Sequence, residues 1–236
     1  MSILAIETST QQLGVALSDE GRPLASYELL AEYPHAVELP GAVTRVLQAA
    51  HLTLDQMEAI VVDVGPGSFT GLRIGLAFVK ALAFPAKRAV VGVSSLDVLA
   101  ANLPFVPLPV CPLLDAKQRN VYGAVYRLQE DRPARQTDYL LGPVEEVLRS
   151  VQGPTLFLGD GCVLYRDRVL AQCPQAQFAA PELWLPRAAT LARLGSERLL
   201  SGARDDPSRL VPLYLYPSDC QVRSPDRPTS VLKKTA

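Results

Sequence analysis

Short apolar runs separated by polar turns fill the first hundred residues of the chain. Residues 59–64 read AIVVDV, which is typical of a buried strand, and residues 24–29 alternate as a half-buried strand does. Leu39, Val43 and Leu47 fall on one face of a helical stretch. The pattern predicts strands over residues 3–7, 14–18, 24–29, 59–64 and 89–93, and helices over 36–50, 70–84 and 96–102. This order indicates a mixed sheet with helices on its faces.

A proline-rich stretch over residues 103–112 then interrupts the pattern, which restarts after it. The segments ETSTQQLGVAL (residues 7–17) and DAKQRNVYGAVY (115–126) share a layout, with an acidic residue at a strand end, a polar turn and a small-apolar strand. We therefore expect two copies of one sheet-and-helix unit. The second part is predicted to hold strands at 110–115, 121–128, 137–141 and 155–158, and helices at 143–151 and 187–200.

The predicted organisation is a first lobe over residues 1–104, a second lobe over 105–204 and a return of 205–217 to the first lobe. Residues 221–236 are polar, contain prolines and are expected to be disordered.

The most informative motif is GPGSFTGLRIG at residues 65–75, where a buried strand enters a glycine turn and then a helix. Free N–H groups at such a helix start suit an anion, so Ser68 and Thr70 could hold a phosphate. The plainer interpretation makes Thr70 the N-cap, with Gly65 and Gly67 required by the turn. The motif is neither a Walker loop nor GxGxxG.

The helix that follows is apolar nearly all round, apart from Arg73 and Lys80. Gly71 and Gly75 lie within it, and each glycine costs a helix about 1 kcal/mol relative to alanine. Close approach of another helix would compensate that cost. We therefore favour a contact with a partner chain over a purely internal role.

Composition narrows the class of protein. The 236 residues are 48% hydrophobic and 20% charged, as in a globular protein, and the net charge of −1 gives no overall attraction to nucleic acid. Four widely spaced cysteines without CxxC read as small hydrophobes, and residues 3–6 are too short for the apolar core of a signal peptide. A cytoplasmic location without membrane contact is expected. The arginines at 119, 127, 132 and 135 are diluted by acidic residues and do not predict strong RNA binding by this chain alone.

At this point the residues match a known family. ILAIETST, GVAL, His35, GPGSFTGLRIG, GVSSLDVLA, the DAK…VYGAVY hairpin and a late PLYL resemble the TsaB (YeaZ) family, strongly over residues 1–128 and loosely beyond. The resemblance implies an α/β fold of two ribonuclease-H-like lobes, that of actin, sugar kinases and heat-shock chaperones (the ASKHA fold). It also implies a non-catalytic subunit that binds and activates TsaD, which modifies adenosine 37 of tRNAs reading ANN codons to N6-threonylcarbamoyladenosine.

The family suggests partners and sites. TsaD would form a heterodimer with this chain, TsaE would join the pair, and tRNA would be met only through the complex. The isolated chain is expected to form a homodimer, because an apolar helical surface without its partner tends to pair with itself. No cofactor is expected beyond weak ATP or ADP at the complex interface. The expected nucleotide-like cleft, vestigial or weak, is Glu7, Thr8, Ser9, Gly65, Gly67, Ser68 and Thr70. The expected partner interface is His35, Leu39, Val43, Leu47, Leu72, Arg73, Gly75, Leu76, Val79 and Lys80.

No catalytic residue or metal ligand is predicted. TsaD-like proteins hold a metal with HxxxH on the first helix, and here Leu39 stands at the second histidine position, so His35 lacks its partner. Two rival functions are an ATP-dependent phosphotransferase of the same fold and an M22-type, glycoprotease-like metallopeptidase. Asp115 and Lys117 fit a hairpin better than a cleft. Asp63 and Tyr216 depart from the family pattern, which has Arg at the second position.

Overall fold

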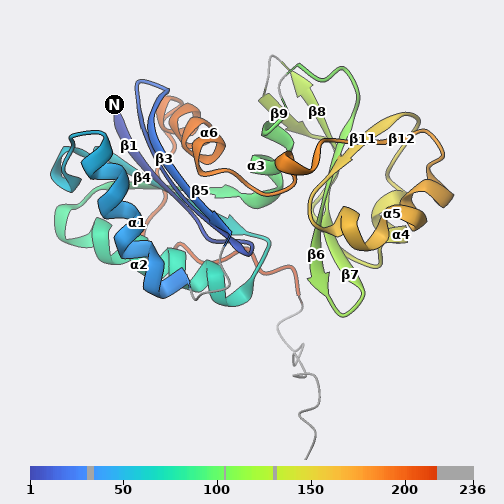
Figure 1. Cartoon of the computed structure of the whole chain (residues 1–236), viewed down its shortest axis with the longest axis horizontal. Helices are drawn as coiled ribbons and strands as arrows, with labels where there is room; N and C mark the ends of the chain where they lie inside the picture. The colour runs from blue at the N-terminus through green and yellow to red at the C-terminus, as the bar shows by residue number, and fades with distance from the viewer. Residues whose placement is uncertain (31–34, 104, 130–131, 217–236) are drawn as a thin grey trace, which may run out of the picture.

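The computed structural model describes residues 1–30, 35–103, 105–129 and 132–216. Two lobes stand side by side, each built on one mixed sheet, and the chain passes from the first lobe to the second and back (Figure 1). The expected tail over residues 221–236, and Cys220 before it, lie outside the described residues.

The first sheet has the strand order β3-β2-β1-β4-β5. Strands β1, β2 and β3 pair antiparallel, whereas β4 and β5 run parallel to β1. Helices α1 and α2 cover one face of the sheet, with a core of leucines and valines beneath them, and α6 covers the other face. The elements are β1 Ser2–Glu7, β2 Gln12–Asp19, β3 Arg22–Leu30, α1 His35–Ala49, β4 Ala59–Gly65, α2 Phe69–Ala86 and β5 Ala89–Ser94.

The second sheet repeats this topology. Its order is β10-β7-β6-β11-β12, with β6, β7 and β10 antiparallel and β11 and β12 parallel to β6. The expected duplication is therefore present in the strand order itself, and β6 corresponds to β1. The elements are β6 Val110–Lys117, β7 Asn120–Gly123, β8 Tyr126–Gln129, β9 Arg132–Arg135, β10 Leu140–Gly142, α4 Val144–Leu148, β11 Thr155–Leu158, α5 Gly161–Gln172 and β12 Ala176–Phe178.

Two helices cross between the lobes. α3 (Ser95–Ala101) follows the first sheet, and its Leu96 and Leu99 pack in a core with residues of the second. α6 (Ala188–Leu200) follows the second sheet yet packs against the strands of the first through Leu191 and Ala192. The predicted second lobe over residues 105–204 therefore wrongly includes α6, because the apolar face of α6 is buried on the first sheet.

Residues 205–216 run along the first lobe after α6. Asp205 bridges to Val90 of β5, its carboxylate accepts from the Gly92 N–H at 2.8 Å, and the Leu213 N–H donates to the Val64 carbonyl at 2.7 Å. This segment therefore connects the edge of the first sheet to the space between the lobes.

Some predicted elements differ from the structure. Residues 121–128 form two strands, β7 and β8, with the break at Ala124 and Val125, where the Val125 N–H donates to the Thr137 hydroxyl. α5 and β12 were not expected. α1 begins at His35, one residue before the predicted start, and Pro40 lies inside it. Ser94 caps α3 by accepting from the Leu96 N–H.

Among the described residues, α2 alone is long and apolar enough to cross a membrane by length and composition. It packs on β4 and contributes Leu76 and Val79 to the first core, so its apolar character has a use within the lobe. A single helix of this kind is weak evidence for a membrane span.

Candidate functional site

The turn between β4 and α2 starts with a cis peptide bond between Gly65 and Pro66 and ends with a capped helix. Ser68 is the N-cap, since its hydroxyl accepts from the Gly71 N–H at 3.2 Å. Thr70 therefore lies within the first turn and is not the N-cap that the sequence suggested. The Ser68 N–H donates to the Ser9 carbonyl at 2.6 Å, so the helix start is hydrogen-bonded to the turn after β1.

Three glycines of this motif, Gly67, Gly71 and Gly75, face the chain's own β1–β2 turn. A Cβ at Gly67 would collide with the Ser9 carbonyl, one at Gly71 with the Thr8 carbonyl, and one at Gly75 with the Thr8 hydroxyl. The sequence argument for a close approach was right, but its attribution to a helix of a partner chain is wrong. The approaching group is the backbone and side chain at the end of β1.

Most residues expected at the partner interface are part of the first core. Leu39, Val43, Leu72, Gly75, Leu76 and Val79 are all buried within the lobe, and Leu39 and Val79 have no exposed surface. They are buried because the apolar sides of α1 and α2 face the sheet. Leu47 and Lys80 are partly exposed, and Arg73 is exposed.

The other side of α2 faces outward. We call five of its exposed residues the α2 outer stripe: Thr70, Arg73, Ala77, Ala81 and Phe84. Phe84 is 54% exposed, and Val37 on the neighbouring α1 is 71% exposed. The helices therefore do present a surface of small and apolar residues, and of the stripe only Arg73 was among the residues expected at the interface.

A cleft of about 970 Å³ lies between the lobes. Of the predicted nucleotide-like residues, Ser9, Gly67, Ser68 and Thr70 line it, as does His35. Glu7, Thr8 and Gly65 do not line it, since their side chains or backbone are packed inside the first lobe. The second lobe contributes Leu114, Asp115, Ala116, Lys117, Gln118, Tyr122 and Asp160.

The β6–β7 hairpin brings charge to the cleft. Lys117 Nζ pairs with Asp115 Oδ2 at 2.6 Å, and this hydrogen bond raises the lysine pKa. The Asp115 N–H donates to Asp160 Oδ1 at 2.9 Å, and burial raises the pKa of the Asp160 carboxyl. Lys117, Gln118 and Arg119 all have positive φ. Asp115 and Lys117 therefore belong to the hairpin, as expected. They also line the cleft.

Aromatic side chains at the cleft were missed from the sequence. The Arg73 guanidinium stacks on Phe69 at 3.8 Å and donates through Nε to the Tyr214 hydroxyl at 3.0 Å. Tyr216 donates to the Ala116 carbonyl at 2.8 Å and meets Tyr122 edge-on. The departure at position 216 therefore has a structural use, because it ties the returning segment to the second lobe.

His35 is the first residue of α1, and its Nε2 lies 2.8 Å from the Thr10 carbonyl. The nitrogen facing a carbonyl carries the proton. Leu39 points into the core, so the second position of HxxxH faces away from the cleft. The described residues contain no group of three His, Cys, Asp or Glu side chains that could hold a metal.

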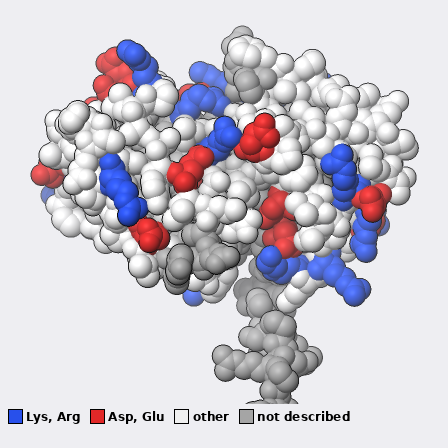
Figure 2. Space-filling view, in the orientation of Figure 1, with Lys and Arg blue, Asp and Glu red and all other residues white. Residues whose placement is uncertain are grey.

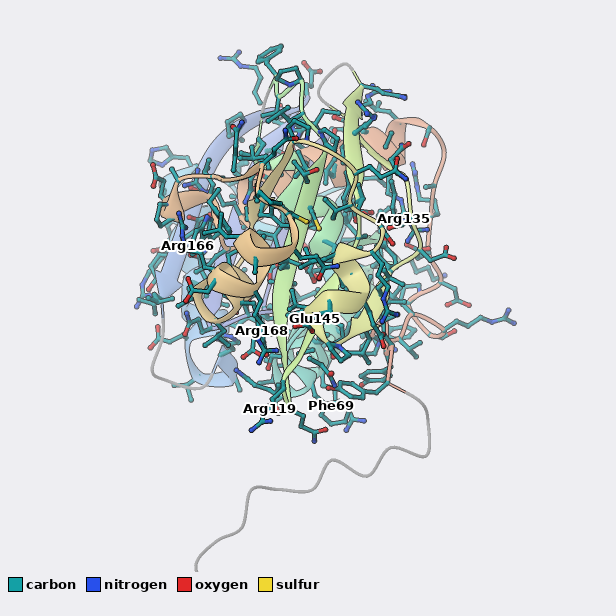
Figure 3. All side chains as sticks on the ribbon, turned by 90° about the vertical axis from the view of Figure 1, so that its right-hand side faces the viewer. Phe69, Arg119, Arg135, Glu145, Arg166 and Arg168 are labelled. Atoms are coloured by element: carbon teal, nitrogen blue, oxygen red, sulfur yellow. The ribbon has the colours of Figure 1, made fainter. Side chains whose placement is uncertain are left out.

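Charge is scattered over the surface. On the face in Figure 2, isolated blue and red side chains lie on a mostly uncharged surface, and positive side chains on the second lobe have negative ones beside them. Figure 3 shows Arg168 of α5 next to Glu145 of α4, and the two form an ion pair of 3.4 Å. Arg135 stacks on Tyr139, and Arg132 pairs with Glu197. These contacts agree with the expectation that the arginines lie on an ordinary charged surface and do not form a strong RNA-binding patch.

Two lobes of repeated topology around a central cleft define a protein of the ASKHA class, which confirms the predicted fold. The (R)-2-hydroxyglutaryl-CoA dehydratase component A of Acidaminococcus fermentans shares this fold, with a TM-score of 0.51 over 85% of this chain and 99% of that one at 9% identity.

Comparison with known proteins then identifies the family. The model of the family TsaD: tRNA N6-adenosine threonylcarbamoyltransferase matches residues 29–161. The tRNA threonylcarbamoyladenosine biosynthesis protein TsaB of Bacillus subtilis is 31% identical, covering 94% of this chain and 97% of its own. YeaZ from Pseudomonas aeruginosa superposes with a TM-score of 0.79 at 30% identity, covering 91% and 99% of the two chains. The chain belongs to the TsaB (YeaZ) family.

Proposed function

We propose that this chain takes part in tRNA threonylcarbamoyladenosine biosynthesis as a non-catalytic subunit that binds and activates TsaD. The names of its relatives support the pathway, and the match to the TsaD family model supports kinship with the transferase. The reaction would be the N6-threonylcarbamoylation of adenosine 37 in tRNAs that read ANN codons.

The observation that carries the proposal is the burial of two positions at which a catalytic relative would need side chains facing the cleft. Glu7, the carboxyl at the end of the first strand, is entirely buried, and Leu39, at the second position of HxxxH, lies in the core. A buried carboxyl cannot meet phosphates or their metal in the cleft, and a leucine cannot hold a metal. Both features support the role of a non-catalytic subunit. They weigh against the phosphotransferase and the metallopeptidase.

The surface offered to TsaD is the α2 outer stripe together with the exposed part of α1. Leu39, Val43 and Leu76 are buried and cannot contact a partner. We therefore assign the contact to the exposed residues Ala77, Ala81 and Phe84. Small residues on a helix allow a partner helix to approach closely, and exposed aromatic and arginine side chains are common at interface centres. The same stripe would pair with itself in the isolated chain. TsaE would join the complex, and tRNA would be met only there, in the cytoplasm.

The cleft itself is proposed to hold nucleotide weakly or not at all. Ser9, Ser68 and Thr70 supply hydroxyls, but Lys117 is already paired with Asp115, and Arg73 with Phe69 and Tyr214. Calorimetry with Mg-ATP on the isolated chain tests this point. Micromolar affinity with turnover would favour the phosphotransferase instead.

The proposal is tested by reconstitution with TsaD, TsaE, TsaC as the source of threonylcarbamoyl-adenylate, and a tRNA reading ANN codons. The isolated chain should transfer no threonylcarbamoyl group, TsaD and TsaE should transfer little, and adding the chain should restore transfer. Transfer by the chain alone, or full transfer without it, would overturn the proposal.

A further inference from the structure

Glu7 and Asp63 lie side by side at the ends of two neighbouring strands. β1 and β4 pair in parallel, and the register Ile6↔Val62 places Glu7 next to Asp63 on the same face. Both side chains have no exposed surface. Two acidic side chains therefore meet where water does not reach.

The hydrogen bonds of the two carboxyl groups leave one oxygen of each carboxyl without a donor. Glu7 Oε1 accepts from the Ser9 N–H and the Ser9 hydroxyl, both at 2.6 Å. Asp63 Oδ1 accepts from the Gly65 N–H and the Ser95 hydroxyl, also at 2.6 Å. The remaining atoms, Glu7 Oε2 and Asp63 Oδ2, are buried without a donor from any other described group. A buried polar atom needs a partner, and the two carboxyl side chains lie within hydrogen-bonding distance of each other.

No cation compensates the pair within the described structure. Neither carboxyl takes part in an ion pair, and β5 carries no ionisable side chain. Charged side chains on the neighbouring elements have other partners. His35 faces the Thr10 carbonyl, Arg73 faces Phe69 and Tyr214, and Asp97 accepts from Tyr126 and Tyr139. Arg187 donates to the Glu182 backbone carbonyl, Arg193 to the Glu197 carboxylate and Arg198 to the Gly92 carbonyl.

We infer that Glu7 and Asp63 hold a single proton between Glu7 Oε2 and Asp63 Oδ2, and that this proton keeps the β1–β2 turn closed on the starts of α2 and α3. Glu7 is the acid and donates, and Asp63 is the carboxylate and accepts, which satisfies all four oxygens. Burial, together with the neighbouring acid, raises the pKa of Glu7 well above its usual range, and burial also raises the pKa of Asp63.

The Glu7–Asp63 pair matters for the cleft because its hydrogen bonds order the β1–β2 turn and the segments that lead into α2 and α3. Glu7 orders Ser9, whose carbonyl accepts from the Ser68 N–H at the start of α2. Asp63 orders Gly65 and the first residue of α3. Removing the proton would leave two negative charges in contact without water, which is strongly unfavourable. The turn that lines the cleft therefore opens at alkaline pH.

The test is the pH dependence of unfolding of the whole chain. Above the usual carboxyl range the folded state holds one more proton than the unfolded state, so the unfolding constant rises about tenfold per pH unit until the proton is lost. Glu7→Gln replaces the O–H donor by an amide N–H donor, and Asp63→Asn removes the charge. Glu7→Gln should lose this slope, whereas Asp63→Asn should end it at a lower pH, because Glu7 stays buried but no longer has a charged neighbour. Glu28→Gln, the same change on an exposed strand residue, should keep it.

An infrared spectrum supplies a second measurement that does not need a folded variant. The wild-type chain at neutral pH should show the carbonyl band of a protonated carboxylic acid, and its absence would overturn the inference. An unchanged slope in Glu7→Gln, or a slope in Asp63→Asn that ends at the same pH as in the wild type, would also overturn it. Stabilisation of the wild type by Mg²⁺ that Glu7→Gln abolishes would assign the pair to a cation and overturn the shared proton.

Discussion

Gly75 of α2 packs directly on Thr8 of the β1–β2 turn, and a Cβ at position 75 would overlap the Thr8 hydroxyl oxygen. Gly71 makes the same kind of contact one helical turn earlier, with the Thr8 carbonyl. The two glycines therefore let the helix lie against the end of β1, and this contact fixes where the helix begins relative to the cleft.

Gly71→Ala and Gly75→Ala should destabilise the chain. Alanine favours a helix by about 1 kcal/mol over glycine, but overpacking against Thr8 costs about 1–3 kcal/mol. A clash with a backbone carbonyl cannot be relieved by a rotamer change, so Gly71→Ala should be the worse of the two. Urea unfolding measures both.

Gly41→Ala is the matched control, because a Cβ there meets nothing closer than the Arg45 guanidinium at 4.0 Å. It should be neutral or stabilising by up to about 1 kcal/mol. Equal stability of all three variants would contradict the packing described for Thr8.

Leu76→Ala should unfold the chain more easily rather than separate it from a partner. Leu76 is 4% exposed within the first core, and truncating a buried leucine costs about 2–5 kcal/mol. The measurement is the denaturant midpoint together with the mass of the folded species in light scattering. A stable variant that changed only its oligomeric state would place Leu76 at an interface after all.

Asp97 should be a stabilising acceptor between the lobes. Its Oδ1 accepts from the hydroxyls of Tyr126 at 2.7 Å and Tyr139 at 3.0 Å. Asp97→Ala leaves both hydroxyls without this acceptor, and each loss costs about 1–3 kcal/mol where the hydroxyl is buried. Asp97→Asn keeps an acceptor oxygen and should cost less. Thermal unfolding of the two variants distinguishes them, and equal losses would contradict this assignment.

Two tyrosines should make the chain less stable at high pH. Burial raises the pKa values of Tyr122 and Tyr139 to about 12. The unfolded chain loses these protons near pH 10, whereas the folded chain keeps them, so the free energy of unfolding falls between about pH 10 and 12. Spectrophotometric titration should show tyrosines ionising late in the native chain and near pH 10 in urea. Titration of every tyrosine near pH 10 in the native chain would contradict the burial.

The sequence was sufficient for local structure and insufficient for long-range pairing. The sequence predicted all the strands of the first sheet, α1 and α2, because the helices bury one face each and the buried strands are short apolar runs between polar turns. α5 was missed although Cys162, Tyr165 and Val169 are buried at helical spacing, since charged residues between them weaken the pattern. The sequence also predicted that something approaches Gly71 and Gly75.

What approaches those glycines depends on contacts between distant segments. Nothing local shows that Thr8 lies under α2, that Asp63 neighbours Glu7, or that α6 returns to the first sheet. The departures at Asp63 and Tyr216 were visible in the sequence, but their uses, a carboxyl pair and a bond to Ala116, became clear only from the fold. For the same reason the sequence could not show that six of the residues expected at the partner interface are buried in their own lobe, because an apolar helix does not reveal which side its own sheet covers.

The most direct test of the proposed function is the affinity of TsaD for the chain, measured by calorimetry with variants of the α2 outer stripe. Ala81→Arg keeps a good helix former at an exposed position, so the fold should persist while the stripe is blocked. Leu164→Arg, on the exposed side of α5, is the control. We predict that Ala81→Arg weakens binding at least tenfold and that Leu164→Arg binds as the wild type does. Wild-type affinity of Ala81→Arg, or equal weakening by both variants, would contradict the assignment of this surface to TsaD.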